Sequence, residues 1–308
     1  MRVRGEIPET FQRRSGLSRA AASRLGVTDA QWRHPGLARP FHGVVSAHAP
    51  RSHRALAEAY ALRMPETQFF SHSTAALFYG IPLPRAVELA QTIHVSARPA
   101  GGLPRAQGVQ GHHEAWDREP VRRGALVLSR PVDTWCELWR ELSLEELVAA
   151  GDYLVTGDEP YSGVPPLATL DELQQAVYEY GSRRGARKLR EALALVRYGS
   201  MSPMETTTRL FLVAKGLPEP ELNHPVFDYD GTLLALIDLA YSEYKVAIEY
   251  QSDLHMESTQ HRNDIARRER LEDRGWTVIY ISIDDIRHRP QETLARVRAR
   301  LRARGALI

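Results

Sequence analysis

Apolar residues recur along this chain with two different periods, and the periods mark its structural elements. The stretch ETTTRLFLVAKG, which starts at Glu205, repeats apolar residues at helical spacing. Residues 233–241 and 245–250 are instead short apolar segments with a polar turn between them, which is typical of the two strands of a β-hairpin. Because both kinds of segment occur, the pattern predicts an α/β protein, α+β overall.

The order of these segments predicts four regions, which are residues 1–60, 61–156, 157–201 and 202–308. In the first region, Ser18 and Thr28 are each placed to cap a short helix, and RPFHGVVS follows as an extended segment. Two short helices followed by strands predict a winged helix-turn-helix-like region. The second region contains the helix SHSTAALFYG, the strands TIHVSAR and ALVLSR, and the helical stretch VDTWCELWRELSLEELVAAGDYLV.

The third and fourth regions form the C-terminal half. The turn-forming stretch GDEPYSGVPP at 157–166 predicts a linker, and two helices then lead to residue 201. The order helix, hairpin, helix, strand, helix in 202–308 predicts a mixed sheet flanked by helices. We expect WTVIYIS, which starts at Trp276, to be a central strand because it is almost continuously apolar. Leu294, Val297 and Leu301 form the apolar stripe of a terminal helix.

Composition restricts the class of protein and its compartment. The chain has 308 residues and is 43% hydrophobic, which is enough for a core in each of two or three units. Its single cysteine, Cys136, excludes a disulfide within the chain and favours a reducing, cytoplasmic compartment. The N-terminal stretch MRVRGEIPETFQRR lacks the apolar segment of a signal peptide, and no apolar run reaches the ~18 residues that span a bilayer. We therefore expect no membrane partner.

The formal charge of +2 conceals an uneven distribution. Residues 1–54 contain ten Arg and three acidic residues, and residues 286–308 contain seven Arg and one Glu. Residues 202–285 contain sixteen acidic and eight basic residues. Basic ends around an acidic centre fit a protein that binds a polyanion beside a metal site, although uneven surface charge alone explains the basic tail equally well.

Two acidic residues lie within the predicted hairpin. If Glu243 and Tyr244 form its turn, the ladder places Asp238 directly opposite Glu249, with Cα atoms roughly 4.5–5.5 Å apart. Facing carboxylates repel one another, and burial adds a desolvation cost, so a cation between them is expected. Gln251 follows Glu249 by two residues and therefore points to the same face of the sheet. The alternative for Asp238, an exposed acid on an edge strand, is weaker because its face also carries Leu234, Leu236 and Ala240.

This spacing resembles the PD-(D/E)XK nuclease superfamily, in which an Asp and a Glu on adjacent strands hold Mg²⁺. The resemblance extends over SPMETTTRLFLVAKGLPEPELNHP, IDLAYSEYKVAIEYQSDLH and HRNDIARRERLEDRGWTVIYIS. These segments resemble a bacterial domain-of-unknown-function family that is related to very-short-patch-repair (Vsr-like) endonucleases. In the superfamily the residue two positions after the Glu is usually Lys, and here it is Gln251; Ser252 stands where many members of the family have Gly.

The resemblance implies a restriction-endonuclease-like fold for 202–308 and roles for several residues. Asp238 and Glu249 would bind Mg²⁺ or Mn²⁺, and Gln251 would orient the attacking water. Glu205 would also face the metal, although on sequence physics its place three residues after Ser202 is that of a capping box. His255, Asp264, Arg267 and Arg268 would lie near the nucleic acid, but a polar loop residue and helix ion pairs explain them more simply.

The N-terminal half has a fainter resemblance to AbiEi-type antitoxin proteins. It is carried by the predicted helix-turn-helix, the SHSTAALFYG helix, the strands, and a helix that reaches Asp152. In that case Arg19, Arg24 and Arg33 would contact phosphates, and solvated surface positions are the alternative. His112, His113 and Glu114 lie in a Gly-rich stretch without a second cluster of ligands, so the sequence does not predict a metal site there.

Two functions are compatible with these features. The first is a metal-dependent endonuclease that hydrolyses phosphodiester bonds, with DNA as partner. The second is a DNA-binding transcriptional regulator of the type IV antitoxin class, in which the nuclease-like domain is degenerate and metal is not needed. A Gly-rich phosphate loop, a Gly-x-Ser-x-Gly elbow and Cys/His zinc spacing do not occur in the sequence, which argues against nucleotide hydrolases, serine esterases and zinc modules.

Overall fold

The computed structural model describes residues 9–12, 16–113, 118–251 and 258–308. For residues 258–265 it describes the backbone but not the side chains. The chain divides into two compact units. The N-terminal unit comprises residues 1–143 with 176–186, and the C-terminal unit comprises 144–175 with 187–308. Within the described residues, no helix is both long enough and apolar enough to cross a membrane.

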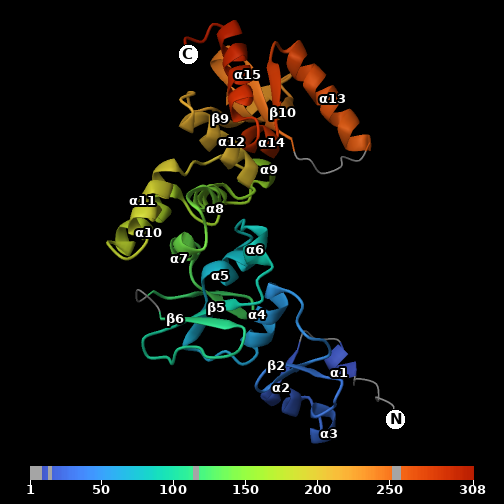
Figure 1. Cartoon of the computed structure of the whole chain (residues 1–308). Helices are drawn as coiled ribbons and strands as arrows, with labels where there is room; N and C mark the ends of the chain where they lie inside the picture. Colours follow the sequence, from blue (N-terminus) through green and yellow to red (C-terminus); the bar gives the residue numbers. More distant parts are fainter. Residues whose placement is uncertain (1–8, 13–15, 114–117, 252–257) are drawn as a thin grey trace. The chain divides into compact units, whose positions relative to one another are not determined.

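The N-terminal unit begins with short helices beside a small antiparallel sheet of order β1-β3-β2 (Figure 1). Ser18 and Thr28 cap α2 and α3 as expected, and Thr28 forms a full capping box with Gln31. The expected strand RPFHGVVS is a tight hairpin, because Gly43 adopts a positive φ of 75° between its two halves. The bounds are α1 Glu9–Gln12, β1 Leu17–Ser18, α2 Arg19–Arg24, α3 Asp29–Trp32, β2 Ala38–Phe41 and β3 Val44–Ser46.

The rest of this unit contains a five-stranded mixed sheet of order β6-β5-β4-β8-β7 together with helices. The helix α5 follows β4 directly and ends at Gly80, which has φ 76°. The free cysteine, Cys136, is buried in α7. The bounds are α4 His53–Ala61, β4 Gln68–Phe70, α5 His72–Tyr79, α6 Arg85–Glu88, β5 Ile93–Ala97, β6 Val109–His113, β7 Val121–Arg123, β8 Leu126–Leu128 and α7 Pro131–Glu137.

The C-terminal unit starts earlier than the predicted boundaries at 156/157 and 201/202, both of which fall inside it. A buried ion pair joins α8 to α12 within this unit: Asp152 accepts hydrogen bonds from Arg209 at 3.0 Å and from Thr206 at 2.8 Å. The predicted linker contains a helix of its own, α9. The bounds are α8 Leu144–Thr156, α9 Glu159–Ser162, α10 Leu170–Tyr180, α11 Ala186–Leu195 and α12 Pro203–Ala214. The first part of α10, up to Gln175, belongs to the C-terminal unit and the rest to the N-terminal unit.

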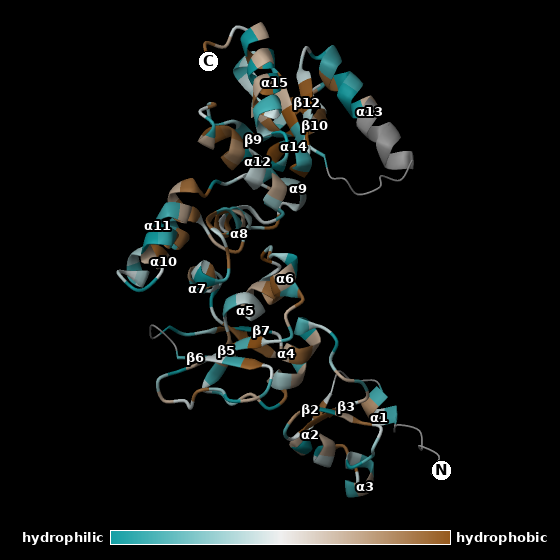
Figure 2. Cartoon of the chain, in the orientation of Figure 1, coloured by the Kyte–Doolittle hydropathy of each residue, from teal (hydrophilic) through white to brown (hydrophobic). Residues whose placement is uncertain are grey.

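The sheet of the C-terminal unit has the order β12-β11-β10-β9 and is mixed, as predicted. The strands β9, β10 and β11 pair in antiparallel fashion, and β11 pairs with β12 in parallel. Hydrophobic residues concentrate on β10 and β12, whereas α13 is largely hydrophilic (Figure 2). The bounds are β9 Glu221–Phe227, β10 Leu233–Tyr241, β11 Val246–Tyr250, α13 Ser258–Asp273, β12 Thr277–Ile281, α14 Ile283–Arg287 and α15 Pro290–Ala303.

Helices cover both faces of this sheet. Leu212 of α12 shares one core with Leu294, Val297 and Leu301 of α15, which confirms the predicted apolar stripe. Leu271 of α13 belongs to a second core with Ala240 and Ala247, which point to the opposite face of the sheet. The mixed α/β architecture is therefore as expected.

One prediction about this sheet was wrong. The segment WTVIYIS forms β12, which is an edge strand and not a central one. Its apolar run reflects cover on both faces by α13 and α15, and not pairing on both sides. Two Arg side chains from the terminal helix and its C-cap donate hydrogen bonds to this strand. Arg296 donates to the Tyr280 carbonyl at 2.9 Å, and Arg304 donates to Thr277 Oγ1 at 2.8 Å.

Candidate carboxylate site

The two strands of the hairpin meet in the predicted register. Leu239 lies opposite Ile248 and Ala240 lies opposite Ala247, so the next pair along the ladder is Asp238 and Glu249. The turn itself is a short 3-10 segment over Ser242–Tyr244, closed by Lys245 in the left-handed conformation with φ 50°. Both acids therefore lie on the face of the sheet that α13 covers.

Asp238 and Glu249 are desolvated neighbours with like charge. Only 5% of Glu249 is exposed. Burial, followed by the charge of Asp238, raises the pKa of Glu249 to about 8. Burial also raises the pKa of Asp238, although its Oδ2 accepts a hydrogen bond from the Tyr250 backbone N–H at 2.9 Å. At neutral pH the pair therefore holds a proton or needs a cation.

Arg267 of α13 supplies one cation to this pair. Its guanidinium donates to both carboxylate oxygens of Glu249, at 2.9 and 3.1 Å, and also to the Leu236 carbonyl. A two-pronged contact of this kind fixes the direction of the carboxylate as well as its charge. The sequence favoured an ion pair of Arg267 with Asp264, whose side chain lies outside the described residues, and did not indicate the contact with Glu249.

Glu205 is the third carboxylate of the group. Its Oε2 accepts hydrogen bonds from Met201 N at 2.8 Å and from Asn223 Nδ2 at 3.1 Å. Ser202 caps α12 through the Glu205 N–H, but the Glu205 carboxylate bonds Met201 and not the Ser202 N–H, so only half of the predicted capping box forms. Burial, followed by the charge of Asp238, raises the pKa of Glu205 to about 7.

Tyr161 of α9 is a neighbour that the sequence did not indicate. Burial, followed by the charges of Asp238 and Glu205, raises the pKa of its hydroxyl. The residue is nevertheless 66% exposed. It lies in the stretch expected to be a linker, so nothing in the local pattern pointed to the carboxylates.

The remaining C-terminal candidates have different positions. Gln251 lies just beyond β11 with an exposed side chain, and its backbone N–H donates to the Ile281 carbonyl at 2.9 Å. Among the described contacts, its side chain makes no hydrogen bond to Asp238 or Glu249. Arg268 is exposed and pairs with Glu272 at 2.7 Å, as an ordinary helix ion pair does. His255 and the side chain of Asp264 lie outside the described residues.

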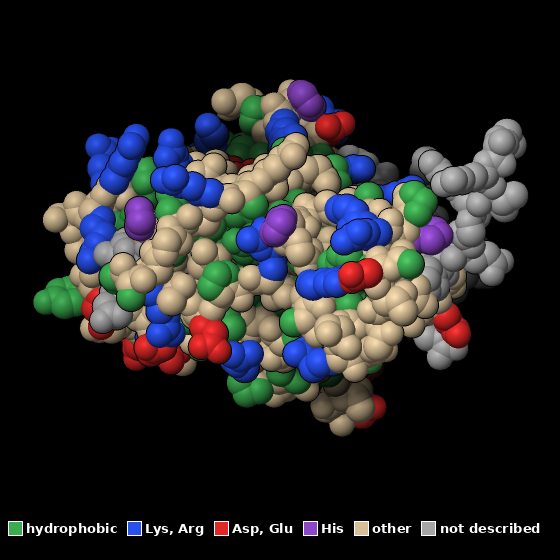
Figure 3. All heavy atoms as spheres, turned by 90° about the horizontal axis from the view of Figure 1, so that it is seen from below, with side chains coloured by type: hydrophobic (Ala, Val, Ile, Leu, Met, Phe, Trp, Pro, Cys, Tyr) green, Lys and Arg blue, Asp and Glu red, His purple; other side chains and the backbone are tan. Residues whose placement is uncertain are grey.

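The three N-terminal arginines are all exposed. Arg19 pairs with Asp29 and lies over the ring of Trp32, with its guanidinium carbon 5.1 Å from the ring centroid. Arg24 is in the last turn of α2, and Arg33 ends α3. On the face drawn in Figure 3, Lys and Arg side chains are spread over the surface with Asp and Glu beside several of them.

The carboxylates fit Mg²⁺ in the type of donor and in charge. Oxygen ligands are the ones that Mg²⁺ prefers, and a single guanidinium balances only one of three carboxylates. Their geometry fits a metal less well, because both carboxylate oxygens of Glu249 already accept hydrogen bonds from Arg267. Within the described residues, the only three side chains of metal-binding type whose ligand atoms all lie within 4.8 Å of one another are histidines, and Glu205, Asp238 and Glu249 do not form such a set.

Comparisons with known proteins find relatives along most of the chain. The chain is 29% identical over 280 residues to an uncharacterized protein of Mycobacterium tuberculosis, named Rv2248 in strain H37Rv. The same identity and length apply to the uncharacterized protein MT2308 of strain CDC 1551. The alignment covers 90% of this chain and 97% of each relative. No family model and no solved structure matches the chain.

Proposed function

We propose that the C-terminal unit is a metal-dependent phosphodiesterase that acts on DNA. The observation that supports this proposal is the pair of Asp238, which is partly buried, and Glu249, which is buried, at facing positions of a hairpin. Burial of two like charges is costly unless a cation compensates them, and the Arg267 guanidinium compensates only one. Glu205, with its raised pKa, adds a third carboxylate to the same electrostatic environment.

Asp238 and Glu249 would hold Mg²⁺ or Mn²⁺, with Glu205 beside them. A bound Mg²⁺ lowers the pKa of a coordinated water and offsets the charge that develops on the phosphate. Of the chain's own residues, Gln251 would orient the water by hydrogen bonding. Tyr161, exposed and close to the carboxylates, is placed to stack on a base of a single-stranded or frayed substrate.

Arg267 supports a second candidate function. Its guanidinium bonds both oxygens of Glu249 and compensates the charge of that carboxylate without a metal ion. A nuclease-like domain that no longer binds metal would be stabilised by such a contact. The chain would then be a DNA-binding regulator, similar to AbiEi-type antitoxins, with a winged-helix-like region at its N-terminus. Exposed Arg24 and Arg33 would serve as phosphate contacts in either case.

Cleavage assays separate the two functions. Full-length protein is incubated with single-stranded and double-stranded DNA, with and without Mg²⁺ or Mn²⁺, and RNA serves as a third substrate. The enzyme proposal predicts metal-dependent cleavage that Asp238→Asn abolishes and Glu243→Gln leaves unchanged, because Glu243 is an exposed acid in the same hairpin. DNA binding without cleavage in any metal would favour the regulator.

A further inference from the structure

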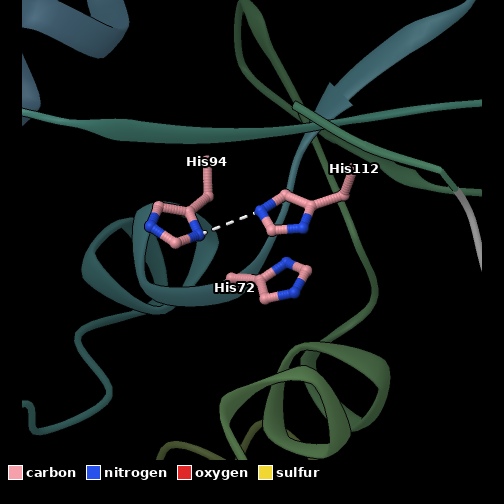
Figure 4. A group of neighbouring side chains, drawn as sticks. All are labelled: His72, His94 and His112. Carbon is pink, nitrogen blue, oxygen red and sulfur yellow. Dashed lines mark hydrogen bonds between the residues drawn. The ribbon is translucent and has the colours of Figure 1, made fainter. Parts of the chain in front are cut away.

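Three histidines that are far apart in the sequence meet in the N-terminal unit (Figure 4). His72 is the first residue of α5, directly after β4, while His94 lies in β5 and His112 in β6. The strands β5 and β6 are parallel, with His94 opposite Gln110 and Ser96 opposite His112. His94 and His112 are therefore diagonal neighbours on one face of the sheet, and the end of β4 brings His72 to the same place.

The ring nitrogens are close enough to share one ion. One ligand atom from each histidine lies within 4.8 Å of the other two. His94 Nδ1 and His112 Nε2 are 3.1 Å apart. Two imidazole nitrogens bound tetrahedrally to one Zn²⁺ at about 2.0–2.1 Å are separated by about 3.3 Å. The ring of His72 is stacked on His112 with 3.8 Å between centroids.

The backbone at His72 is held in an unfavourable conformation. Its φ is 52°, in the left-handed region that a residue with a Cβ rarely adopts. Such a conformation is unfavourable and persists only where the surroundings impose it, which is most common at functional sites. Here the His72 N–H donates to Glu137 Oε2 at 2.8 Å, and this contact directs the histidine toward its two partners.

Two carboxylates lie behind the histidines. Glu141 Oε2 is 3.7 Å from His94 Nε2, and Glu137 Oε2 is 3.9 Å from His72 Nδ1. Histidines that bind metals usually have such a carboxylate at the second ring nitrogen, where it orients the ring and increases its basicity. Glu141 Oε1 is buried without a hydrogen-bond partner among the described residues, which is a cost that a nearby cation would offset.

Burial also disfavours the protonated form of each histidine. Burial lowers the pKa of His94 and of His112 to about 4, and it lowers that of His72 well below its usual value. Neutral imidazole is the form that binds a metal.

We propose that His72, His94 and His112 form a binding site for a divalent transition-metal ion, with Zn²⁺ as the best match. Three imidazole ligands select Zn²⁺ over Mg²⁺, which prefers oxygen. The site borders a cavity of about 500 Å³ that is lined by the three histidines, Glu137, Glu141 and Arg140, among others. A fourth coordination position is thereby open to water or to a small anionic ligand, as in zinc sites that bind substrates.

The site is independent of the carboxylate site described above. It uses nitrogen ligands from the N-terminal unit, whereas Asp238 and Glu249 supply oxygen from the C-terminal unit. The alternative explanation is a metal-free cluster in which the three rings only stack and share hydrogen bonds. That alternative predicts no stoichiometric metal binding.

Zinc binding to the full-length, metal-stripped protein tests the proposal, by competition with a chromophoric chelator. We expect one Zn²⁺ per chain at the histidines, and His94→Gln should weaken binding at least tenfold. His113→Gln is the matched control, because His113 is the next residue on β6 and its side chain is exposed. Asp238→Asn should also leave this binding unchanged, which excludes the carboxylate site as its source.

Two further measurements keep the test decisive if His94→Gln is poorly folded. Glu141→Gln retains all three ligands and should weaken Zn²⁺ binding about 10–100-fold through loss of the outer carboxylate. Co²⁺ in place of Zn²⁺ should give the visible absorption of a tetrahedral site in wild type and in His113→Gln. Absence of stoichiometric Zn²⁺ binding by wild type, or binding that Glu141→Gln and His94→Gln both leave unchanged, would overturn the proposal.

Discussion

Three carboxylates and one guanidinium determine the electrostatics of the carboxylate site, where Glu205 and Glu249 are buried and Asp238 is partly buried. Glu205, Asp238 and Glu249 all have raised pKa values, and burial is the largest cause in each case. Arg267 neutralises Glu249 alone. The balance of charge at this site therefore depends on pH and on any added cation. Single-residue variants measure how each group contributes to that dependence.

Arg267→Gln should destabilise the protein by about 2 kcal/mol above pH 8, because it leaves Glu249 buried without its partner. The loss should be smaller near pH 6, where Glu249 is protonated. Arg268→Gln is the control on the same helix, and its exposed pair with Glu272 predicts a change below about 0.5 kcal/mol. Urea unfolding at both pH values measures the difference, and equal losses for the two variants would contradict the contact.

Stability should fall as the pH rises from about 5 to about 8. Over this range Glu205 and Glu249 keep protons in the folded state that they release in the unfolded state, because their folded pKa values are about 7 and about 8. Unfolding therefore releases protons and becomes easier as the pH rises. Urea melts should show that Glu249→Gln reduces this slope and that Glu243→Gln does not. If Glu249→Gln leaves the pH dependence of the unfolding free energy unchanged, Glu249 is not its cause.

Gln251→Lys should increase metal-dependent DNA cleavage if the site is a weakened nuclease. A Lys at this position, on the face of Asp238 and Glu249, supplies the positive charge that Gln cannot. Lys245 does not substitute for it, because its Nζ donates to the Arg274 carbonyl at 3.0 Å. Cleavage by Gln251→Lys is compared with Gln251→Ala, and equal rates for the two variants would count against the assigned role.

At the scale of elements, local features were predictable and sheet order was not. The caps at Ser18 and Thr28 and the pairing of Asp238 with Glu249 depend on residues close in sequence, and the structure has all of them. The edge position of β12 depends on which strands pair across the whole unit. An apolar run shows that a strand is covered but not whether it has neighbours on both sides.

The terminal helix α15 carries a prediction of its own. Arg298 donates to the Lys215 carbonyl at 2.8 Å and Arg302 donates to the Ile308 carbonyl at 2.6 Å, whereas Arg300 is exposed. If all three contact DNA, replacing them with Gln should reduce the salt slope of binding by about three units. Their bonds to carbonyls favour a smaller change, of about one unit from Arg300. An unchanged slope would assign the helix to packing alone.

At the scale of the whole molecule, both candidate sites depend on contacts between distant segments. Arg267, which contacts Glu249, lies eighteen residues further along the chain, and the histidines at 72, 94 and 112 come from three elements. The three histidines lie 22 and 18 residues apart in the sequence, so they show no local metal-binding spacing. Only the sheet order β6-β5-β4 brings them together. The hairpin acids were predictable because a single turn relates them.

Thermal unfolding of the full-length protein in a Mg²⁺ titration tests the central proposal most directly. An ion that binds only the folded site stabilises it by about 1.4 kcal/mol at ten times its Kd. We predict that Mg²⁺ raises the Tm of wild type, Glu243→Gln and His94→Gln. Asp238→Asn should show no rise, while being at least as stable as wild type without metal because a repulsion is relieved. A wild-type Tm that Mg²⁺ and Mn²⁺ leave unchanged would contradict the metal-dependent enzyme and leave the DNA-binding regulator.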